Sequence, residues 1–289
     1  MVLRAQSGET ISWKPPLRPE LATMAEASKL ERLWATKNAD DEWWSSFVTS
    51  PIAILLNWVV VDWRWLSPNL ITFFSLVTGV AASVLIVLGG ASNFLFAAGL
   101  IQLSHILDCM DGQMAKYRSE PSRFGEYFDK VTDQIQVFLW FAALAYAAYL
   151  QTESVTPVFL AFTGVALYSL RVYVKYVTIF IQVQHDRDYL TKSSEEACAI
   201  RTSNRPEAGL QAGWKANFIW LLREQRKFFL FNEAVFVFLL SAALVTNQLV
   251  PMLWIFASSQ VYFGVVRSWQ RGRQIYTNQQ AALLKPMEK

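Results

Sequence analysis

The chain has 289 residues, of which 53% are hydrophobic and 17% charged, and its formal net charge is +3. A soluble domain usually carries about 25% charged residues, and the apolar stretches of this chain are too long and too many for a soluble core. The small net charge gives no reason to expect a nucleic-acid partner. Two cysteines, Cys109 and Cys198, are too few for a disulfide framework, and we expect them to be unpaired. The composition indicates an integral membrane protein.

The N-terminal region is predicted to be a polar extension. Residues 1–41 are polar, contain three prolines and lack the apolar segment of a cleavable signal peptide, although residues 20–37 can form a short amphipathic helix. Residues 42–63 are rich in tryptophan, which favours the membrane–water boundary, and are interrupted by Pro51. We therefore expect an interfacial helix that lies along the bilayer. An extra spanning helix is the alternative.

Six apolar stretches of membrane-spanning length follow. They are predicted at residues 68–88, 94–114, 124–150, 157–183, 228–245 and 251–267. The sequence thus predicts an all-α integral membrane protein, with six transmembrane helices preceded by an interfacial amphipathic helix. We place the membrane domain at residues 42–270 and a cytoplasmic tail at 271–289. The polar loop 184–227 is long enough to cover a site, but it also suits a linker.

The distribution of basic residues orients the predicted helices. The short connections at residues 90–93, 151–156 and 246–250 contain no lysine or arginine, whereas the connections on the opposite side and the tail are basic. The positive-inside rule then places both termini on the cytoplasmic side. We expect a bacterial inner membrane.

Four aspartates interrupt the apolar sequence between the second and third predicted spans: Asp108, Asp111, Asp129 and Asp133. Acidic groups at membrane depth are costly, so they suggest a functional site. Asp108 and Asp111 are three residues apart and Asp129 and Asp133 four apart, so each pair shares one helix face. The short connection makes the two helices antiparallel neighbours and brings the pairs together near their cytoplasmic ends. This arrangement suits one or two hard cations; solvated helix ends and an ion pathway are the alternatives.

The residues around the aspartates suggest phosphoryl-group chemistry. Gly112 allows a ligand to approach closely, Ala115 keeps the helix surface flat, and Lys116 and Arg118 supply positive charge for phosphate. A metal ion at such a site can neutralise a diphosphate, and a remaining carboxylate can accept a proton from an attacking hydroxyl. These features indicate transfer of a phosphoryl group between a nucleotide-activated substrate and a membrane substrate.

The segment DCMDGQMAKYRSEPSRFGEYFDKVTD resembles the signature D-x2-D-G-x2-A-R-x8-G-x3-D-x3-D of the CDP-alcohol phosphotransferase (CDP-alcohol phosphatidyltransferase) family. Each fixed position matches except Lys116, where the family has arginine. The upstream sequence SPNLIT is similar to the entry of the family's first membrane helix, and the interfacial helix before six spans is also typical of the family. The likeness covers roughly residues 42–270.

The resemblance implies a role for each motif residue. Asp108, Asp111 and Asp129 would be ligands of a two-metal centre containing Mg²⁺ or Mn²⁺, and Asp133 would share ligation or act as general base. The cytidine nucleotide would bind at a close-packed pocket, and the residues expected there are Gly112, Ala115 and Gly125, with Asn69 and Thr72 nearby and Lys116 on a phosphate. The reaction would release CMP and form a phospholipid, and the family likeness also suggests a homodimer.

The sequence leaves the donor open between two subclasses. Arg171 and Lys175 share one face of the fourth predicted span and could bind the phosphate of an acceptor or of the lipid diphosphate, although snorkelling to the interface is the alternative. Because these residues and the basic loop suit a phosphorylated polar acceptor, we favour CDP-diacylglycerol as donor. Head-group transfer from a CDP-linked polar alcohol is the second possibility. A carboxylate-lined transporter is the competing class, but we see neither related halves nor broken helices.

Overall fold

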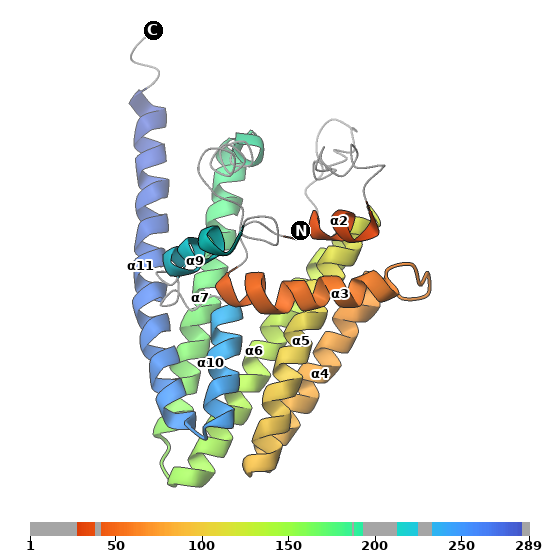
Figure 1. Ribbon diagram of the computed structural model, residues 1–289. Coiled ribbons are helices and arrows are strands. Elements are labelled where there is room, and N and C mark those ends of the chain that lie inside the picture. The colour runs from red at the N-terminus through yellow and green to blue at the C-terminus, as the bar shows by residue number, and fades with distance from the viewer. Residues whose placement is uncertain (1–27, 38–41, 187, 193–212, 225–232, 285–289) are drawn as a thin grey trace.

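A computed structural model describes residues 28–37, 42–186, 188–192, 213–224 and 233–284, and its regular elements are helices. In chain order they are α2 (Lys29–Trp34), the π-helix η1 (Ser45–Thr49), α3 (Ser50–Val60), α4 (Pro68–Leu88), α5 (Ala91–Tyr117), α6 (Arg123–Thr152), α7 (Thr156–His185), α9 (Gly213–Glu224), α10 (Glu233–Val245) and α11 (Leu249–Leu284). Figure 1 shows the long helices side by side in a bundle, with α3 running across them. The predicted all-α class is confirmed.

Five of these helices are long and apolar enough to cross a membrane: α4, α5, α6, α7 and α11. The prediction of six spans is not confirmed. The helix that corresponds to the fifth predicted span is α10, which has 13 residues, whereas a span needs about 20. Residues 228–232 of that predicted span lie outside the described residues.

Local signals explain the ends of α4, which match the predicted bounds. The side chain of Ser67 accepts a hydrogen bond from the backbone N–H of Leu70 at 3.2 Å, and Pro68 occupies the first turn. Gly89, with a φ of 69°, ends the helix in a conformation that favours glycine.

The last helix differs from its predicted bounds. It is α11, which has 36 residues and continues well beyond residue 267, where we expected it to end. At about 1.5 Å per residue, it is longer than a bilayer core of about 30 Å, and it rises past α10 in Figure 1.

Close contacts between helices form the core of the bundle. Phe141 of α6 stacks on Phe256 of α11 with ring centroids 3.7 Å apart, and both side chains are fully buried. Gly164 of α7 lets Phe256 approach, because a Cβ at residue 164 would lie 2.5 Å from the ring. Gly79 of α4 lets Gln136 of α6 approach in the same way, because a Cβ at residue 79 would lie 2.7 Å from Gln136 Oε1. Gly79 thus sets how closely α4 approaches α6, which carries half of the acidic motif, and Gly164 sets how closely α7 approaches α11.

The tryptophan-rich segment forms η1 and α3, which together cross the ends of the long helices in Figure 1. Leu55, Trp58 and Val59 of α3 are each more than half exposed, as expected for a helix with one face toward lipid. Pro51 does not interrupt this segment: it lies in the first turn of α3, and the π-turn of η1 precedes it. The 11 residues of α3 are too few to span a bilayer. The interfacial interpretation is therefore favoured over an extra span.

Hydrogen bonds attach this interfacial segment to α5. Trp44 Nε1 donates to Gln102 Oε1 at 2.9 Å, and Ser45 Oγ lies 3.0 Å from His105 Nε2. Asn57 Nδ2 donates to the Met110 carbonyl at 3.0 Å and to Gln113 Oε1 at 3.2 Å. Cys109 of α5 also lies 3.7 Å from Thr49 Oγ1. The α5 side chains in these contacts are therefore spaced by three, four and four residues, and they are Gln102, His105, Cys109 and Gln113. One face of α5 is therefore polar along four turns and is covered by η1 and α3.

The predicted loop 184–227 contains the helix α9. Trp220 of α9 is 5% exposed, and its ring lies 5.1 Å from that of Phe47 in η1. The described part of the loop therefore packs on the interfacial segment. Cys198, expected to be unpaired, lies outside the described residues.

Arg118 was expected to supply positive charge for phosphate, but the structure gives it another role. Its guanidinium donates to the backbone carbonyls of Val61 (2.9 and 2.7 Å), Trp63 (2.9 Å) and Leu66 (2.7 Å). These carbonyls belong to the C-cap of α3 and the turn that leads to α4. A planar guanidinium can satisfy several acceptors at once, so Arg118 holds the interfacial helix against the end of α5.

We therefore predict that Arg118→Lys destabilises the protein. An ammonium cannot bridge carbonyls on both sides of the turn, and hydrogen bonds to charged groups contribute about 1.5–3 kcal/mol each, so the loss should be on the order of 3 kcal/mol. Thermal unfolding in detergent would measure it. Arg64→Lys, at an exposed arginine in the same turn, should leave the unfolding temperature unchanged. Equal unfolding temperatures for the two variants would contradict the role of Arg118.

Candidate active site

Three carboxylates from two helices meet near one end of the bundle. Asp108 and Asp111 of α5 and Asp129 of α6 each place one oxygen within 4.8 Å of the others. Asp111 is buried, with 6% exposure, and the other two are half-buried. The spacing within each helix and the short turn between α5 and α6 produce this meeting, as the sequence suggested.

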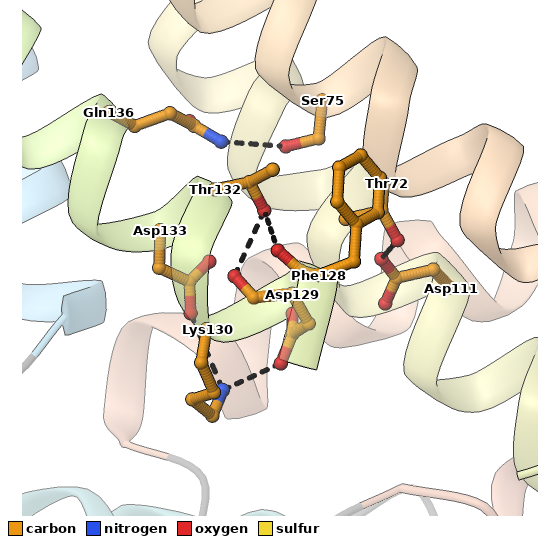
Figure 2. A network of polar contacts seen from close by, with 9 residues as sticks. All are labelled: Thr72, Ser75, Asp111, Phe128, Asp129, Lys130, Thr132, Asp133 and Gln136. Atoms are coloured by element: carbon orange, nitrogen blue, oxygen red, sulfur yellow. Dashed lines mark hydrogen bonds and ion pairs between the residues drawn. The ribbon is translucent and has the colours of Figure 1, made fainter. Parts of the chain in front are cut away.

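The most buried of these carboxylates has a partner from a third helix. The hydroxyl of Thr72 in α4 donates to Asp111 Oδ2, and Thr72 is itself only 3% exposed. Figure 2 shows this contact on one side of the acidic group. A hydrogen bond to a buried carboxylate fixes its orientation and offsets part of the cost of its burial. Thr72 is therefore a supporting residue and not a wall of the pocket.

Asp133 lies one turn after Asp129 on α6, and Lys130 connects the two. The ammonium of Lys130 is 2.6 Å from Asp129 Oδ2 and 3.4 Å from Asp133 Oδ2 (Figure 2). The side chain of Lys130 is 57% exposed, whereas that of Asp133 is 19% exposed, so solvent weakens the pairing. One exposed ammonium does not balance four carboxylates, and the site keeps an excess of negative charge.

A layer of buried polar side chains lies beneath the carboxylates, one turn further into the bundle. Ser104 Oγ of α5 donates to Gln136 Oε1 of α6 at 2.6 Å. Gln136 Nε2 donates to Ser75 Oγ of α4 at 3.4 Å, a contact that Figure 2 shows. All three side chains are at most 5% exposed. They join α4, α5 and α6 where the helices must hold the acidic groups, and they line a narrow cavity that also reaches Asp108 and Asp133.

A larger cavity of about 320 Å³ opens at the carboxylates. The residues that line it are Thr36, Glu42, Ser45, Ser50, His105, Asp108, Cys109, Asp111, Gly112, Gln113, Lys116, Asp129, Lys130, Asp133 and Ala234. It therefore contains all four predicted aspartates, together with Gly112 and Lys116. A volume of this size can accept a nucleotide-sized ligand in part.

The two predicted glycines have different surroundings. A Cβ at Gly112 would meet no other atom within 4 Å, which agrees with its place on the cavity wall. A Cβ at Gly125 would lie 2.8 Å from both Asn69 Oδ1 and Ser122 Oγ. Gly125 thus makes room for Asn69 of α4 beside the N-cap of α6, and neither residue lines the cavity.

Two further predicted residues also lie outside the cavity wall. The carbonyl of Ala115 accepts a hydrogen bond from the N–H of Glu120 at 2.9 Å, so Ala115 helps to form the turn between α5 and α6. Arg171 of α7 is half-buried, with its guanidinium 5.2 Å from the ring centroid of Tyr168. Tyr168 lines the narrow cavity together with Asp108 and Asp133, so Arg171 contacts a residue of that cavity wall.

Nine residues of the cavity wall were not predicted, and Glu42 and Thr36 are two of them. Glu42 Oε2 accepts a hydrogen bond at 3.3 Å from the N–H of Val235, in the first turn of α10. An acid at a helix N-terminus is favourable, and Glu42 thus joins the start of the interfacial segment to α10. Thr36 reaches the cavity from the segment after α2. Neither residue carries a sequence signal, because each depends on a contact with a distant part of the chain.

The donor atoms fit a hard divalent cation. Carboxylate oxygens are the preferred ligands of Mg²⁺ and similar ions, and ligand distances of about 2.0–2.6 Å allow two oxygens on one ion to lie up to about 5 Å apart. The three oxygens of Asp108, Asp111 and Asp129 meet this limit at 4.8 Å. The excess negative charge of the site points to the same class of ligand.

The surroundings of the two glycines predict opposite effects of alanine on stability. Gly125→Ala would displace the Ser122 cap and Asn69, at a cost of about 1–3 kcal/mol, which exceeds the gain in helix propensity of about 1 kcal/mol. Gly112→Ala faces open space and keeps that gain. Thermal unfolding in detergent should therefore show a lower midpoint for Gly125→Ala and an equal or higher one for Gly112→Ala. The reverse order would contradict the packing described here.

Comparisons with known proteins place this site in a family. The structure is similar to "Mycobacterium tuberculosis phosphatidylinositol phosphate synthase (PgsA1) with CDP-DAG bound", with a TM-score of 0.48 and 18% identity over 80% of this chain and 94% of that chain. A search of curated proteins found no match. Residues 65–266 match the family described as CDP-alcohol phosphatidyltransferase. The match covers more than half of the chain and includes the four aspartates, the polar layer beneath them and Lys116. The chain therefore belongs to the CDP-alcohol phosphatidyltransferase family and is a membrane transferase of phospholipid biosynthesis, a CDP-alcohol phosphotransferase.

Proposed function

We propose that the protein carries out a metal-dependent transfer of a substituted phosphate group from CDP-diacylglycerol to a polar alcohol, with release of CMP. The observation that carries the proposal is the meeting of Asp108, Asp111 and Asp129 on the wall of a cavity that also contains Asp133. This arrangement combines a cation site formed by three carboxylates with a fourth carboxylate, Asp133, outside that group of three. Within the family, these two elements suit transfer from a diphosphate to a hydroxyl.

Asp108, Asp111 and Asp129 would hold Mg²⁺ or Mn²⁺, in a centre of two metal ions to which Asp133 can contribute. When bound, the metal neutralises the diphosphate and stabilises the negative charge of the leaving group. Thr72 orients Asp111 through its hydroxyl, and Lys130 offsets part of the charge of Asp129 and Asp133. These contacts preorganise the carboxylates before a ligand enters.

Asp133 is the proposed general base. The acceptor hydroxyl gives its proton to the Asp133 carboxylate, and its oxygen forms a bond to the β-phosphorus of the donor. The bond between that phosphorus and the bridging oxygen breaks, and CMP leaves with the electron pair. The half-buried position of Asp133, on both the large cavity and the narrow one, suits contact with the hydroxyl of an acceptor.

Gly112 and Lys116 are the proposed contacts of the nucleotide. Gly112 leaves open space on the wall of the large cavity, and Lys116 places an ammonium on the same wall, where it can pair with a phosphate. Ala115, Gly125 and Asn69 would act from behind, through the turn and the helix cap that shape this end of α5 and α6. Their direct contact with the nucleotide stays a prediction.

The choice of CDP-diacylglycerol as donor rests on the proposed acceptor side. Arg171 contacts Tyr168, which lines the narrow cavity that also reaches Asp133. A cation on this side of the site suits a polar acceptor that carries a phosphate, whereas a diacylglycerol acceptor would gain nothing from it. If the acceptor is the polar partner, the lipid must enter as the CDP-linked donor.

Several expectations stay predictions. They are the homodimer, the bacterial inner membrane, the cytoplasmic orientation of the site and the division of the chain at residues 41 and 270. The three turns without basic residues join α4 to α5, α6 to α7 and α10 to α11 at one end of the bundle (Figure 1), whereas the carboxylates lie toward the other ends of α5 and α6, which supports the orientation.

The test is CMP release by the purified protein in lipid. We expect release with CDP-diacylglycerol and a polar alcohol when Mg²⁺ or Mn²⁺ is present, and its loss when a chelator is added. Asp133→Asn, which keeps the shape of the side chain but removes the base, should lower the rate by about 10²–10⁴-fold. Asp188→Asn, at an exposed position after α7, is the matched control.

Other outcomes of this test discriminate between the alternatives. Release only with a CDP-linked amino alcohol and diacylglycerol would reverse donor and acceptor. Release by Asp133→Asn at the wild-type rate would exclude Asp133 as base. No metal-dependent release with any donor would contradict the proposed function.

Thr72→Val tests the support of the metal ligands. Valine has the shape of threonine but cannot donate to Asp111, and the loss of such a partner typically weakens metal affinity by about 10–100-fold. We expect the metal concentration for half-maximal CMP release to rise by this factor, with little change in the rate at saturating metal. Thr78→Val is the control, because the Thr78 hydroxyl donates at 2.7 Å to the carbonyl of Phe74 on the same helix. Similar metal dependence in both variants would exclude this role of Thr72.

A further inference from the structure

The helix α2 lies outside the part of the chain that matches the family, yet it is firmly packed against it. Leu33 of α2 is fully buried. It belongs to a cluster with Ile54 of α3, Ile71 of α4 and Met110 and Met114 of α5. Figure 1 shows α2 beside the end of α5. Burial of a leucine contributes about 1.5–3 kcal/mol, so this contact is sufficient to hold a short helix in place.

Polar contacts at both ends of α2 fix its position further. Ser28 and Glu31 form a capping box at its start. Lys29 pairs with Asp62, which follows α3. The guanidinium of Arg32 lies 4.6 Å from the ring centroid of Tyr117, the last residue of α5. The helix is thus attached to both elements that lead to the site.

This docking brings Thr36 into the active-site cavity. Thr36 is 1% exposed, and its hydroxyl donates to the carbonyl of Leu33 at 2.6 Å. The carbonyl of Thr36 accepts a hydrogen bond from Lys116 Nζ at 3.4 Å. Thr36 and Lys116 both line the cavity that contains the aspartates. The segment after α2 is therefore a wall of the site, and it contacts the proposed phosphate-binding cation.

We propose that α2 is a positioning element of the active site, which uses the Thr36 carbonyl to hold the ammonium of Lys116 toward a phosphate of the nucleotide donor. The proposal rests on the function proposed above, since it assigns Lys116 to the donor. A lysine side chain loses about 2 kcal/mol of rotamer entropy when it is fixed, and a neighbour that fixes it beforehand removes part of this loss from binding. A backbone carbonyl accepts one of the three ammonium protons of the lysine.

The same contact accounts for the departure of this chain from its family motif. Lysine stands at residue 116, where the family signature has arginine. A guanidinium can engage a phosphate with two parallel hydrogen bonds, whereas an ammonium is a point charge on a flexible stem. Thr36, which lies outside the family match at residues 65–266, supplies the restraint that the planar group would otherwise provide.

A double-mutant cycle between Leu33 and Lys116 tests the proposal. Leu33→Ser should undock α2 and raise the KM for the CDP-linked donor about 10-fold, with kcat changed less than 2-fold. Lys116→Met should raise the same KM. In the Lys116→Met background, the addition of Leu33→Ser should change KM less than 2-fold, because the group that α2 positions is already absent. The affinity for CMP, measured by calorimetry with Mg²⁺, should show the same coupling without turnover.

Two controls separate positioning from general loss of structure. Leu33→Met keeps the buried volume and should keep the wild-type KM. Leu30→Gln changes an exposed side chain of the same helix and should change KM less than 2-fold. Hydrogen exchange of residues 28–37 would show that Leu33→Ser undocks the helix while the spanning helices stay protected.

The outcomes are distinct. Additive effects of Leu33→Ser and Lys116→Met on KM and on CMP affinity would overturn the proposal, as would an undocked α2 with unchanged KM. In both cases the wild-type protein would still release CMP, so the proposed function would stand. A wild-type protein that released no CMP with any donor would overturn the proposed function and this inference with it.

Discussion

The need to hold four carboxylates inside an apolar bundle governs the rest of this structure. Burial of a carboxylate is costly unless it is paired or hydrogen-bonded, and each device that offsets this cost comes from a different place. Thr72 donates from α4, Lys130 pairs along α6, and the cavity keeps the group accessible to a cation. These devices work only if α4, α5 and α6 keep a fixed spacing. The contact of Gln136 with Gly79 and the buried hydrogen bonds to Ser75 and Ser104 supply that spacing.

Much of this arrangement could be predicted from the sequence because it depends on near neighbours. The ends of α4 follow from Ser67, Pro68 and Gly89, which act on the adjacent turns. The meeting of Asp108, Asp111 and Asp129 follows from their helical spacing and from a turn too short to let α5 and α6 separate. Even the supporting place of Thr72 was within reach, since the motif resemblance put it near the site.

The parts that could not be predicted depend on backbone groups far away in the sequence. Arg118 binds carbonyls more than 50 residues earlier, and Lys116 contacts one 80 residues earlier. A carbonyl has no residue-type signature, so the sequence predicts a phosphate contact for both basic side chains and gives no sign of either carbonyl contact. The length of α10 and the continuation of α11 were missed for a related reason: apolar composition predicts a span, but the packing of the neighbouring helices determines where a helix begins and ends.

The position of α5 shows how the constraint acts on the whole chain. This helix is less apolar than α4, because it carries aspartates toward α6 and the polar row from Gln102 to Gln113 toward the interfacial segment. A helix with two polar faces cannot be exposed to lipid. It must be covered, and α4, α10 and the segment of η1 and α3 pack against it, while α6 meets it through the polar side chains of the site. The interfacial segment is therefore required by the active site as much as by the membrane surface. Without it, His105 and Gln113 would face lipid, and the helix that holds Asp108 and Asp111 would lose the hydrogen bonds that fix its position.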